Sequence, residues 1–190
     1  IKNKICISRF YFLCFKEESF VAYEVISKIY DELMEEVDYN QWCDFMEKLF
    51  LERTPDIHHI LELGCGSGIM TECLLNKGYE VVGVDTSEEM LFLAQERLRR
   101  FGNKVILMEQ DIENMDFEIY EIDCIFSSND TLNYILEQDK LKNLLSYLNR
   151  RLKKGGTFLF DISSEYKLSE ILGNNVFGQS FEDMIYLWEN

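Results

Sequence analysis

Three glycines at alternate positions are the first residues of this chain that could do chemistry. The stretch Ile60 to Gly68 reads ILELGCGSG, so Gly64, Gly66 and Gly68 follow an apolar run and precede a helical pattern. This order predicts a buried strand that turns tightly into a helix. Because glycine has no Cβ, the turn leaves room for a bulky ligand, and the helix offers unpaired N–H groups to an anion.

A carboxylate stands at the end of the next predicted strand. Asp85 directly follows VVGV at residues 81–84. In doubly wound α/β folds, a carboxylate at this place accepts hydrogen bonds from the two hydroxyls of a ribose. The dinucleotide-binding pattern G-x-G-x-x-G needs a third glycine where this chain has Ile69. A nicotinamide-dependent oxidoreductase is therefore disfavoured, although it remains an alternative.

The pattern G-x-G-x-G, preceded by Glu62, resembles motif I of the class I S-adenosylmethionine-dependent methyltransferases. Asp85 fits the acidic residue that closes the second strand in that family, and residues 110–112 fit its adenine-side loop after the third strand. Residues 123–130 fit its fourth strand and the mouth of its active site. The resemblance covers residues 21–190 and implies a Rossmann-like methyltransferase fold with S-adenosyl-L-methionine as the cofactor.

The resemblance also implies a role for each motif residue. Glu62, Gly64 and Gly66 are expected to hold the methionine end of the cofactor. Asp85 is expected at the ribose. Residues 111–112 are expected at the adenine, where the Asp111 carboxylate would accept a hydrogen bond from the adenine amino group. The full set of expected cofactor-binding residues is Glu62, Gly64, Cys65, Gly66, Gly68, Asp85, Thr86, Met90, Gln110, Asp111, Ile112 and Ser127.

Polar residues after the fourth predicted strand are the candidates for orienting the methyl acceptor. Asn129, Asp130 and Tyr134 are the expected catalytic residues, with Asn133 beside them. A helix cap or turn over residues 130–133 is the alternative. Methyl transfer from a sulfonium is an in-line displacement on an activated methyl group, so the protein has mainly to align the acceptor and exclude water. No nucleophile motif is needed.

The composition of the chain restricts the classes of partner and acceptor that we expect it to bind. With 19 Lys plus Arg against 35 Asp plus Glu, the formal charge of −16 would repel phosphate backbones, so we expect a small-molecule acceptor, with a protein side chain as the alternative, and no nucleic acid. No apolar run approaches the roughly 18 residues of a membrane helix, which predicts no membrane association. The six cysteines contain no C-x-x-C pair, which suits reduced thiols in the cytoplasm. The two histidines, His58 and His59, are expected to be structural, and no metal is expected.

Strand and helix patterns alternate along the centre of the chain, which predicts an α/β fold with a doubly wound, mostly parallel sheet. Before the glycines, two amphipathic helices are expected from Ala22 to Thr54-Pro55, and their aromatic residues belong to the core or to the acceptor pocket. The candidates for the pocket are Tyr30, Asp31, Tyr39 and Trp42. The strands are expected near residues 58–63, 80–85, 104–108, 122–126 and 157–162. A capping box at 86–89 begins one later helix, and Gly155-Gly156 is expected to end another that spans 141–152.

The two ends of the chain depart from this pattern. Residues 1–20 have no place in it, so we interpret them as a non-native or disordered leader and residues 21–190 as one methyltransferase domain. The segment 181–190 resembles the beginning of a strand, whereas the family closes its sheet with an antiparallel pair. We therefore expect the domain to be C-terminally incomplete and to lack that antiparallel strand. A module that binds the cofactor without catalysis and regulates a partner is the second alternative.

Overall fold

The computed structural model describes residues 9–12, 37–118, 121–173, 175–180 and 185–189. The chain divides into two compact units. Tyr23–Ile162 forms one unit, and Ile1–Ala22 joins Ser163–Asn190 in the other. The glycine loop and Asp85 both lie in the first unit.

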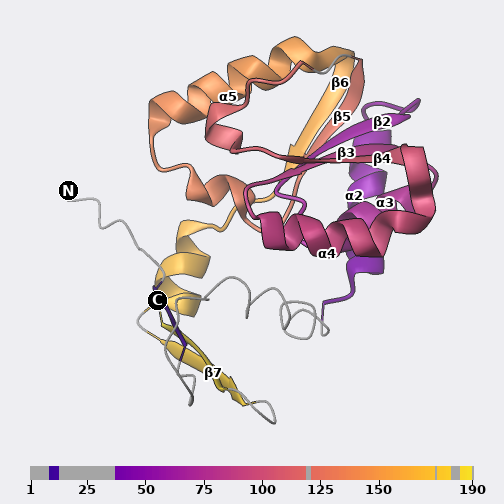
Figure 1. Ribbon diagram of the computed structural model, residues 1–190. Helices are drawn as coiled ribbons and strands as arrows, with labels where there is room; N and C mark the ends of the chain where they lie inside the picture. The colour runs from indigo at the N-terminus through magenta and orange to yellow at the C-terminus, as the bar shows by residue number, and fades with distance from the viewer. Residues whose placement is uncertain (1–8, 13–36, 119–120, 174, 181–184, 190) are drawn as a thin grey trace. The chain divides into compact units, whose positions relative to one another are not determined.

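A five-stranded parallel sheet forms the centre of the larger unit, as the alternation of patterns predicts (Figure 1). The strand order is β4-β3-β2-β5-β6, so the chain reverses its direction of progress between β2 and β5. In an open parallel sheet, ligands bind outside the carboxyl ends of the strands at such a switch point. The strands are β2 (His59–Leu63), β3 (Glu80–Asp85), β4 (Val105–Glu109), β5 (Ile122–Ser127) and β6 (Leu152–Phe160).

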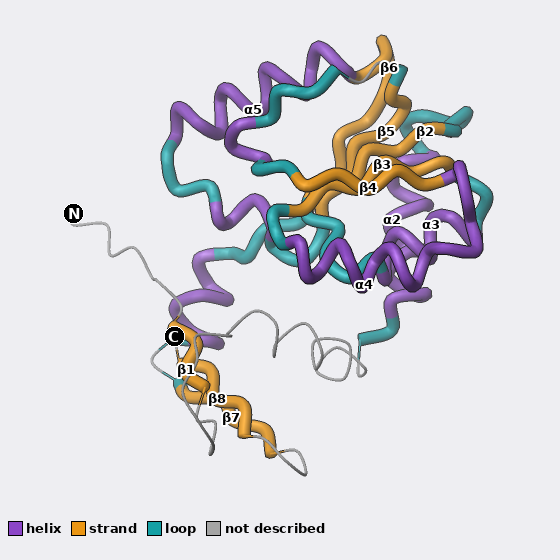
Figure 2. The backbone as a smooth tube through the Cα atoms, viewed as in Figure 1, coloured by secondary structure: helices purple, strands orange, loops and turns teal. Residues whose placement is uncertain are grey.

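Helices connect these strands and cover the sheet on both faces (Figure 2). The α-helices are α2 (Tyr39–Leu51), α3 (Ile69–Asn76), α4 (Glu88–Leu98) and α5 (Gln138–Arg151). Three short 3₁₀ helices lie in the connections: η1 (Arg99–Lys104), η2 (Ile112–Asn114) and η3 (Thr131–Tyr134). None of the helices in the described residues combines the length and apolarity needed to cross a membrane.

Each central strand supplies two apolar cores, because successive residues of a strand point to opposite faces. Ile60 and Phe126 belong to the core that also contains residues of α2, α3 and α4. Leu61 and Ile125, their chain neighbours, belong to the core that contains residues of α5. The sheet is therefore buried on both faces, as a parallel sheet requires.

Three details of the helices differ from the sequence predictions. The N-cap of α4 is Ser87, whose Oγ accepts from the N–H of Met90 at 3.2 Å, so the predicted box is displaced by one residue from Thr86. Helix α5 ends at Arg151, before the glycine pair, because Leu152 already belongs to β6. Phe45 of α2, one of the aromatic residues expected in the core or in the acceptor pocket, is exposed and does not belong to the core.

The smaller unit contains a three-stranded antiparallel sheet of order β1-β8-β7. Its strands are β1 (Arg9–Phe12), β7 (Val176–Ser180) and β8 (Ile185–Glu189), and a short π-helix spans Lys167–Leu172. β1 comes from the segment interpreted as a leader, and that interpretation and the boundary at residue 21 stay predictions. The rest of this segment, and the first expected amphipathic helix up to residue 36, lie outside the described residues.

Asp123 of β5 connects the amino ends of β2, β5 and β6. Its side chain is 6% exposed, and Oδ2 accepts from the backbone N–H groups of His58 and His59, both at 2.9 Å. Its Oδ1 lies 2.7 Å from Nζ of Lys153 on β6. Burial would raise the pKa of Asp123, but the hydrogen bonds from Lys153 and from the His59 and His58 backbone outweigh it and hold this pKa below its ordinary value.

We expect Asp123→Asn to lower the free energy of unfolding at pH 7 by about 1.5–3 kcal/mol, because hydrogen bonds to a charged group are lost. A lowered carboxyl pKa stabilises the fold above the pKa of the unfolded chain, about 3.9, and this contribution disappears as the pH falls through the folded value. Urea unfolding should therefore show the gap between parent and variant shrinking from pH 7 to pH 3. Asp116→Asn, at an exposed position, is the control. A gap of the same size at both pH values would contradict the assignment.

Candidate functional site

The glycine loop is fastened to the end of β3 by its own backbone. The N–H groups of Gly64 and Cys65 both donate to the carbonyl oxygen of Val84, at 2.8 and 3.0 Å. The N–H of Gly68 donates to the carbonyl of Cys65 at 3.0 Å, which closes the turn into α3. Gly64, Gly66 and Gly68 all have positive φ, at 71°, 52° and 80°. L-residues with a Cβ rarely adopt this conformation, which explains the choice of glycine.

The three glycines differ in what surrounds them. A Cβ on Gly64 would lie 2.5 Å from Oγ1 of Thr131, and one on Gly68 would lie 3.1 Å from Cβ of Ala94. These two glycines allow η3 and α4 to approach the loop. A Cβ on Gly66 would meet nothing within 4 Å. Gly66 is therefore the glycine of the loop whose bare backbone faces open space, and the other two are required by packing within the protein.

The Asp85 carboxylate binds the loop and the start of α4 at once. Its Oδ2 accepts from the N–H of Gly66 at 2.8 Å, and its Oδ1 accepts from the N–H of Ser87 at 3.0 Å. The carbonyl of Asp85 accepts from the N–H of Gln110 at 2.8 Å. Three segments that the sequence predicts to share one site, the loop and the ends of β3 and β4, are thus joined through a single residue.

Glu62 is a buried acid beneath the loop. Glu62 is 1% exposed, and its Oε2 accepts from the hydroxyl of Thr71 on α3 at 2.6 Å. Burial raises the pKa of Glu62 to about 8, because a carboxylate loses its hydration there. The carboxyl group is therefore largely protonated at neutral pH, and a cation beside it would favour ionisation.

Other expected cofactor residues occupy different positions. Cys65 is buried against Gly83, and burial, followed by the negative charges of Glu62 and Asp85, raises the pKa of its thiol well above the usual value. The Ser127 hydroxyl is buried and donates to the carbonyl of Leu63 at 3.4 Å. Thr86 is exposed and Met90 is buried on either side of the α4 N-cap. The roles of these residues toward a cofactor remain predictions.

The loop after β4 caps its own short helix. Asp111 is the N-cap of η2, and its Oδ1 accepts from the N–H of Glu113 at 2.9 Å. Its Oδ2 accepts from Nδ2 of Asn114 at 2.7 Å. Ile112 is buried in the core with residues of α5. The carboxylate of Asp111 therefore already has two protein partners, and a bond to an adenine amino group would use a remaining lone pair.

The segment after β5 lies against the glycine loop through the contact of Thr131 with Gly64. Asn129 and Asp130 both adopt positive φ, at 58° and 59°. Such strain in two successive residues with side chains is typical of functional sites. Asp130 is the N-cap residue of η3, and its backbone carbonyl accepts from the N–H of Asn133 at 2.8 Å, so the alternative of a helix cap or turn over residues 130–133 is present, although the Asp130 side chain makes no capping bond. Tyr134 is 74% exposed at the end of η3.

Sequence reasoning missed Asp161, which follows β6. Its Oδ2 accepts from the backbone N–H of Asp130 at 3.3 Å, and its own N–H donates to the carbonyl of Ser127 at 3.3 Å. The predicted strand at 157–162 placed Asp161 inside the strand, whereas β6 ends at Phe160 and leaves Asp161 at the carboxyl end of the sheet. Thr71 and Thr131 were also missed, because only the folded chain brings them to Glu62 and Gly64.

The aromatic candidates before the loop are only partly described. Tyr39 is buried in the core, as the alternative interpretation expects. Trp42 is partly buried and lines a cavity of about 430 Å³ together with Val37, Asp38, Gln41 and Phe45. Tyr30 and Asp31 lie outside the described residues.

Comparison with known proteins identifies the family of this chain. Residues 60–156 match the family described as Methyltransferase domain. The Bacillus subtilis (strain 168) protein YqeM, whose name assigns it provisionally to the methyltransferases, is 32% identical over 170 residues, which are 90% of this chain and 67% of that protein. A crystal structure of an S-adenosylmethionine-dependent methyltransferase from Clostridium acetobutylicum ATCC 824 has a TM-score of 0.77 at 40% identity, over 88% of this chain and 68% of that one.

The CcbJ methyltransferase from Streptomyces caelestis is a more distant neighbour, with a TM-score of 0.70 at 25% identity, over 85% of this chain and 65% of that one. The parallel sheet, the loop fastened to β3 and the carboxylate at Asp85 agree with these relationships. The chain therefore belongs to the class I S-adenosylmethionine-dependent methyltransferases.

Proposed function

We propose that this chain transfers the methyl group of S-adenosylmethionine to a small-molecule acceptor, with the cofactor held between the glycine loop and Asp85. The observation that carries the proposal is the open space at Gly66, whose N–H is bonded to the Asp85 carboxylate at 2.8 Å. Bare backbone and a carboxylate thus stand side by side at the carboxyl ends of β2 and β3. A ligand that carries a ribose and bulky substituents fits this combination.

The residues around this junction match the chemical parts of the cofactor. Asp85 retains lone pairs for the ribose hydroxyls after accepting from Gly66 and Ser87. Glu62 supplies a buried acid on the strand that leads into the loop, which suits a positively charged methionine end. We assign the adenine to Asp111 and Ile112, next along the sheet edge after β4.

When bound, the cofactor supplies a methyl group that its sulfonium has already activated. The protein therefore has to place the acceptor in line with that group and keep water out. We assign acceptor alignment to the strained segment Asn129–Asp130 and to Tyr134, with Asp161 holding the backbone of Asp130. The contact of Thr131 with Gly64 keeps this segment beside the loop.

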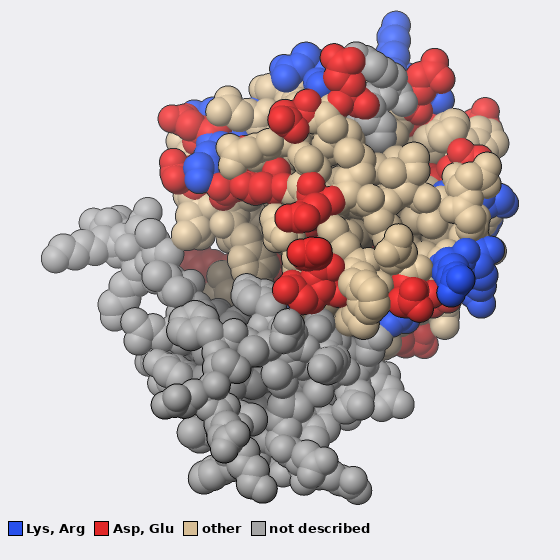
Figure 3. Space-filling model, viewed as in Figure 1, with Lys and Arg blue, Asp and Glu red and all other residues tan. Residues whose placement is uncertain are grey.

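Charge favours a small acceptor over a nucleic acid. On the face drawn in Figure 3, acidic side chains lie across the centre, and the Lys and Arg side chains of the described residues form separate groups at its margin. Together with the formal charge of −16, this arrangement disfavours phosphate backbones. Among proteins with this fold, CalS10 is an amino pentose methyltransferase and KedS8 a sugar N-methyltransferase, so the fold accommodates small acceptors. The fold alone does not select one.

The acceptor class is testable with cofactor labelled in its methyl group. We expect label to enter the low-molecular-weight fraction of a cell extract, and to remain out of separately supplied protein and RNA, because a strongly acidic protein repels RNA. Scintillation counting after size fractionation is the measurement. Label recovered mainly in RNA or in protein would overturn the small-molecule acceptor while leaving methyl transfer intact.

Gly66→Ala tests the cradle, with Gly102→Ala as a matched control. Both glycines have positive φ, 52° and 58°, and open space at the Cβ position, so both substitutions strain the backbone without creating a clash. Only Gly66 lies in the loop, so calorimetry should show at least about tenfold weaker cofactor binding for Gly66→Ala alone, which corresponds to about 1.4 kcal/mol. Equal cofactor affinities of the two variants would show that the cofactor does not bind at this loop.

The protonation of Glu62 gives a test that does not depend on turnover. At pH 7, below its pKa of about 8, the carboxyl group is largely protonated, and a nearby cation lowers that pKa. Cofactor binding should therefore release up to one proton, seen as a binding enthalpy that varies with the ionisation enthalpy of the buffer. Glu62→Gln should lose this dependence and Glu72→Gln should keep it. If Glu62→Gln releases as many protons as the parent on cofactor binding, Glu62 is not the group that ionises when the cofactor binds.

A further inference from the structure

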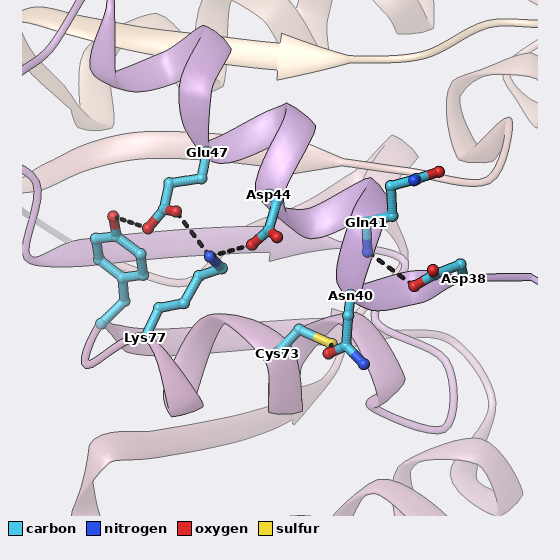
Figure 4. A network of polar contacts seen from close by, with 8 residues as sticks. Asp38, Asn40, Gln41, Asp44, Glu47, Cys73 and Lys77 are labelled. Atoms are coloured by element: carbon cyan, nitrogen blue, oxygen red, sulfur yellow. Dashed lines mark hydrogen bonds and ion pairs between the residues drawn. The ribbon is translucent and has the colours of Figure 1, made fainter.

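Helices α2 and α3 meet along a polar stripe that the methyltransferase site does not use (Figure 4). Nζ of Lys77 lies 2.5 Å from Oδ1 of Asp44 and 2.7 Å from Oε2 of Glu47. The hydroxyl of Tyr79 donates to the other oxygen of Glu47 at 2.8 Å. These bonds fix the register in which the end of α3 faces the middle of α2.

A thiol occupies the same stripe one turn earlier on α3. Cys73 precedes Lys77 by four residues, so the two side chains lie on one face of the helix. The Sγ of Cys73 donates to Oδ1 of Asn40 on α2 at 3.5 Å (Figure 4). Cys43 lies three residues after Asn40 and directly before Asp44, so it stands between the two positions that α3 contacts. The helix register therefore brings Cys43 and Cys73 to the same level of the interface.

Cys73 packs against the buried cluster that contains Cys43, and the two thiols differ in exposure. Cys43 is fully buried in the core, whereas Cys73 is partly exposed. The neighbouring Cys43 thiol lowers the pKa of Cys73, and the proximity of Cys73 together with burial raises the pKa of Cys43. The Lys77 ammonium, on the same face of α3, also lowers the pKa of Cys73. Cys73 is thus the partner that ionises and can be reached from solvent.

We propose that Cys43 and Cys73 form a dithiol that a peroxide oxidises to a disulfide between α2 and α3. The Cys73 thiolate attacks one peroxide oxygen, the O–O bond breaks with release of hydroxide, and a sulfenic acid forms on Cys73. The Cys43 sulfur then attacks the Cys73 sulfur, the S–O bond breaks, and the proton of Cys43 leaves with the hydroxyl group as water. Overall, two thiols and one hydrogen peroxide become one disulfide and two waters.

The other described cysteines lack these features. Cys65 and Cys124 are both buried, and burial raises the pKa of Cys124 to about 12 and the pKa of Cys65 well above its usual value. Since the thiolate is the species that reacts, both should be slow toward peroxide. Cys124 therefore provides a matched control within the same core, which also contains Cys43.

Mass spectrometry of the folded chain tests the proposal. Cys6 and Cys14 lie outside the described residues, so both are first replaced by serine to leave four thiols. Treatment with excess hydrogen peroxide, alkylation and non-reducing proteolysis should give one cross-linked peptide pair containing Cys43 and Cys73, lighter by two hydrogens and lost on reduction. Cys124→Ser should retain the pair. Cys43→Ser should lose it and instead accumulate sulfenic acid on Cys73, which a dimedone adduct traps.

Two outcomes would overturn the proposal. One is a folded parent in which Cys73 oxidises to sulfinic acid without any cross-link to Cys43, because the two sulfurs would then not meet. The other is an equal yield of all cysteine pairs, both when the folded chain is oxidised and when the chain unfolded in urea is oxidised. The packing of α2 against α3 would then not select the pair of Cys43 and Cys73. Neither result depends on methyl transfer, so this test and that of the proposed function can fail separately.

Discussion

The carbonyl oxygen of Val84 holds the site together, because two successive N–H groups of the glycine loop donate to it. This shared acceptor fixes the loop to the end of β3, and the next residue, Asp85, adds a bond to Gly66. The parallel pairing of β2 with β3 sets the register that makes these bonds possible, with Leu63 opposite Val84. A slip of that pairing would move the loop away from the carboxylate and turn the buried side chains to the wrong face.

Close packing explains why the surroundings of the loop admit so little change. Gly64 allows Thr131 to approach the loop, and Gly68 allows Ala94 of α4 to pack against it. Both contacts bring elements distant in sequence to the mouth of the site. Only Gly66 keeps free space, so the pattern G-x-G-x-G contains two kinds of glycine. Two position protein against protein, and one leaves backbone accessible to a ligand.

The two buried acids Asp123 and Glu62 differ in protonation because their surroundings differ. Asp123 is buried but receives three donors at the amino ends of the strands, so it stays charged and stabilises the sheet. Glu62 is buried and accepts from the hydroxyl of Thr71, but the cost of burial outweighs this bond and its pKa rises. A buried acid that is largely protonated until a cation arrives is suited to a binding site, whereas a fully bonded carboxylate is suited to structure.

The sequence by itself determined the order of the parallel strands and of the α-helices between them, the family, and the junction of loop and Asp85, but it did not predict β1 or β7 of the smaller unit. These features follow from local patterns: apolar runs, glycine spacing and a carboxylate at a strand end. The tertiary structure alone decided that Ser87 caps α4, that Thr131 contacts Gly64, that Asp161 binds the backbone of Asp130 and that Cys73 packs against the core containing Cys43. Each of these depends on which segments become neighbours in space. A pattern along one segment records its own periodicity, but the register against its neighbours is set by packing of the whole core.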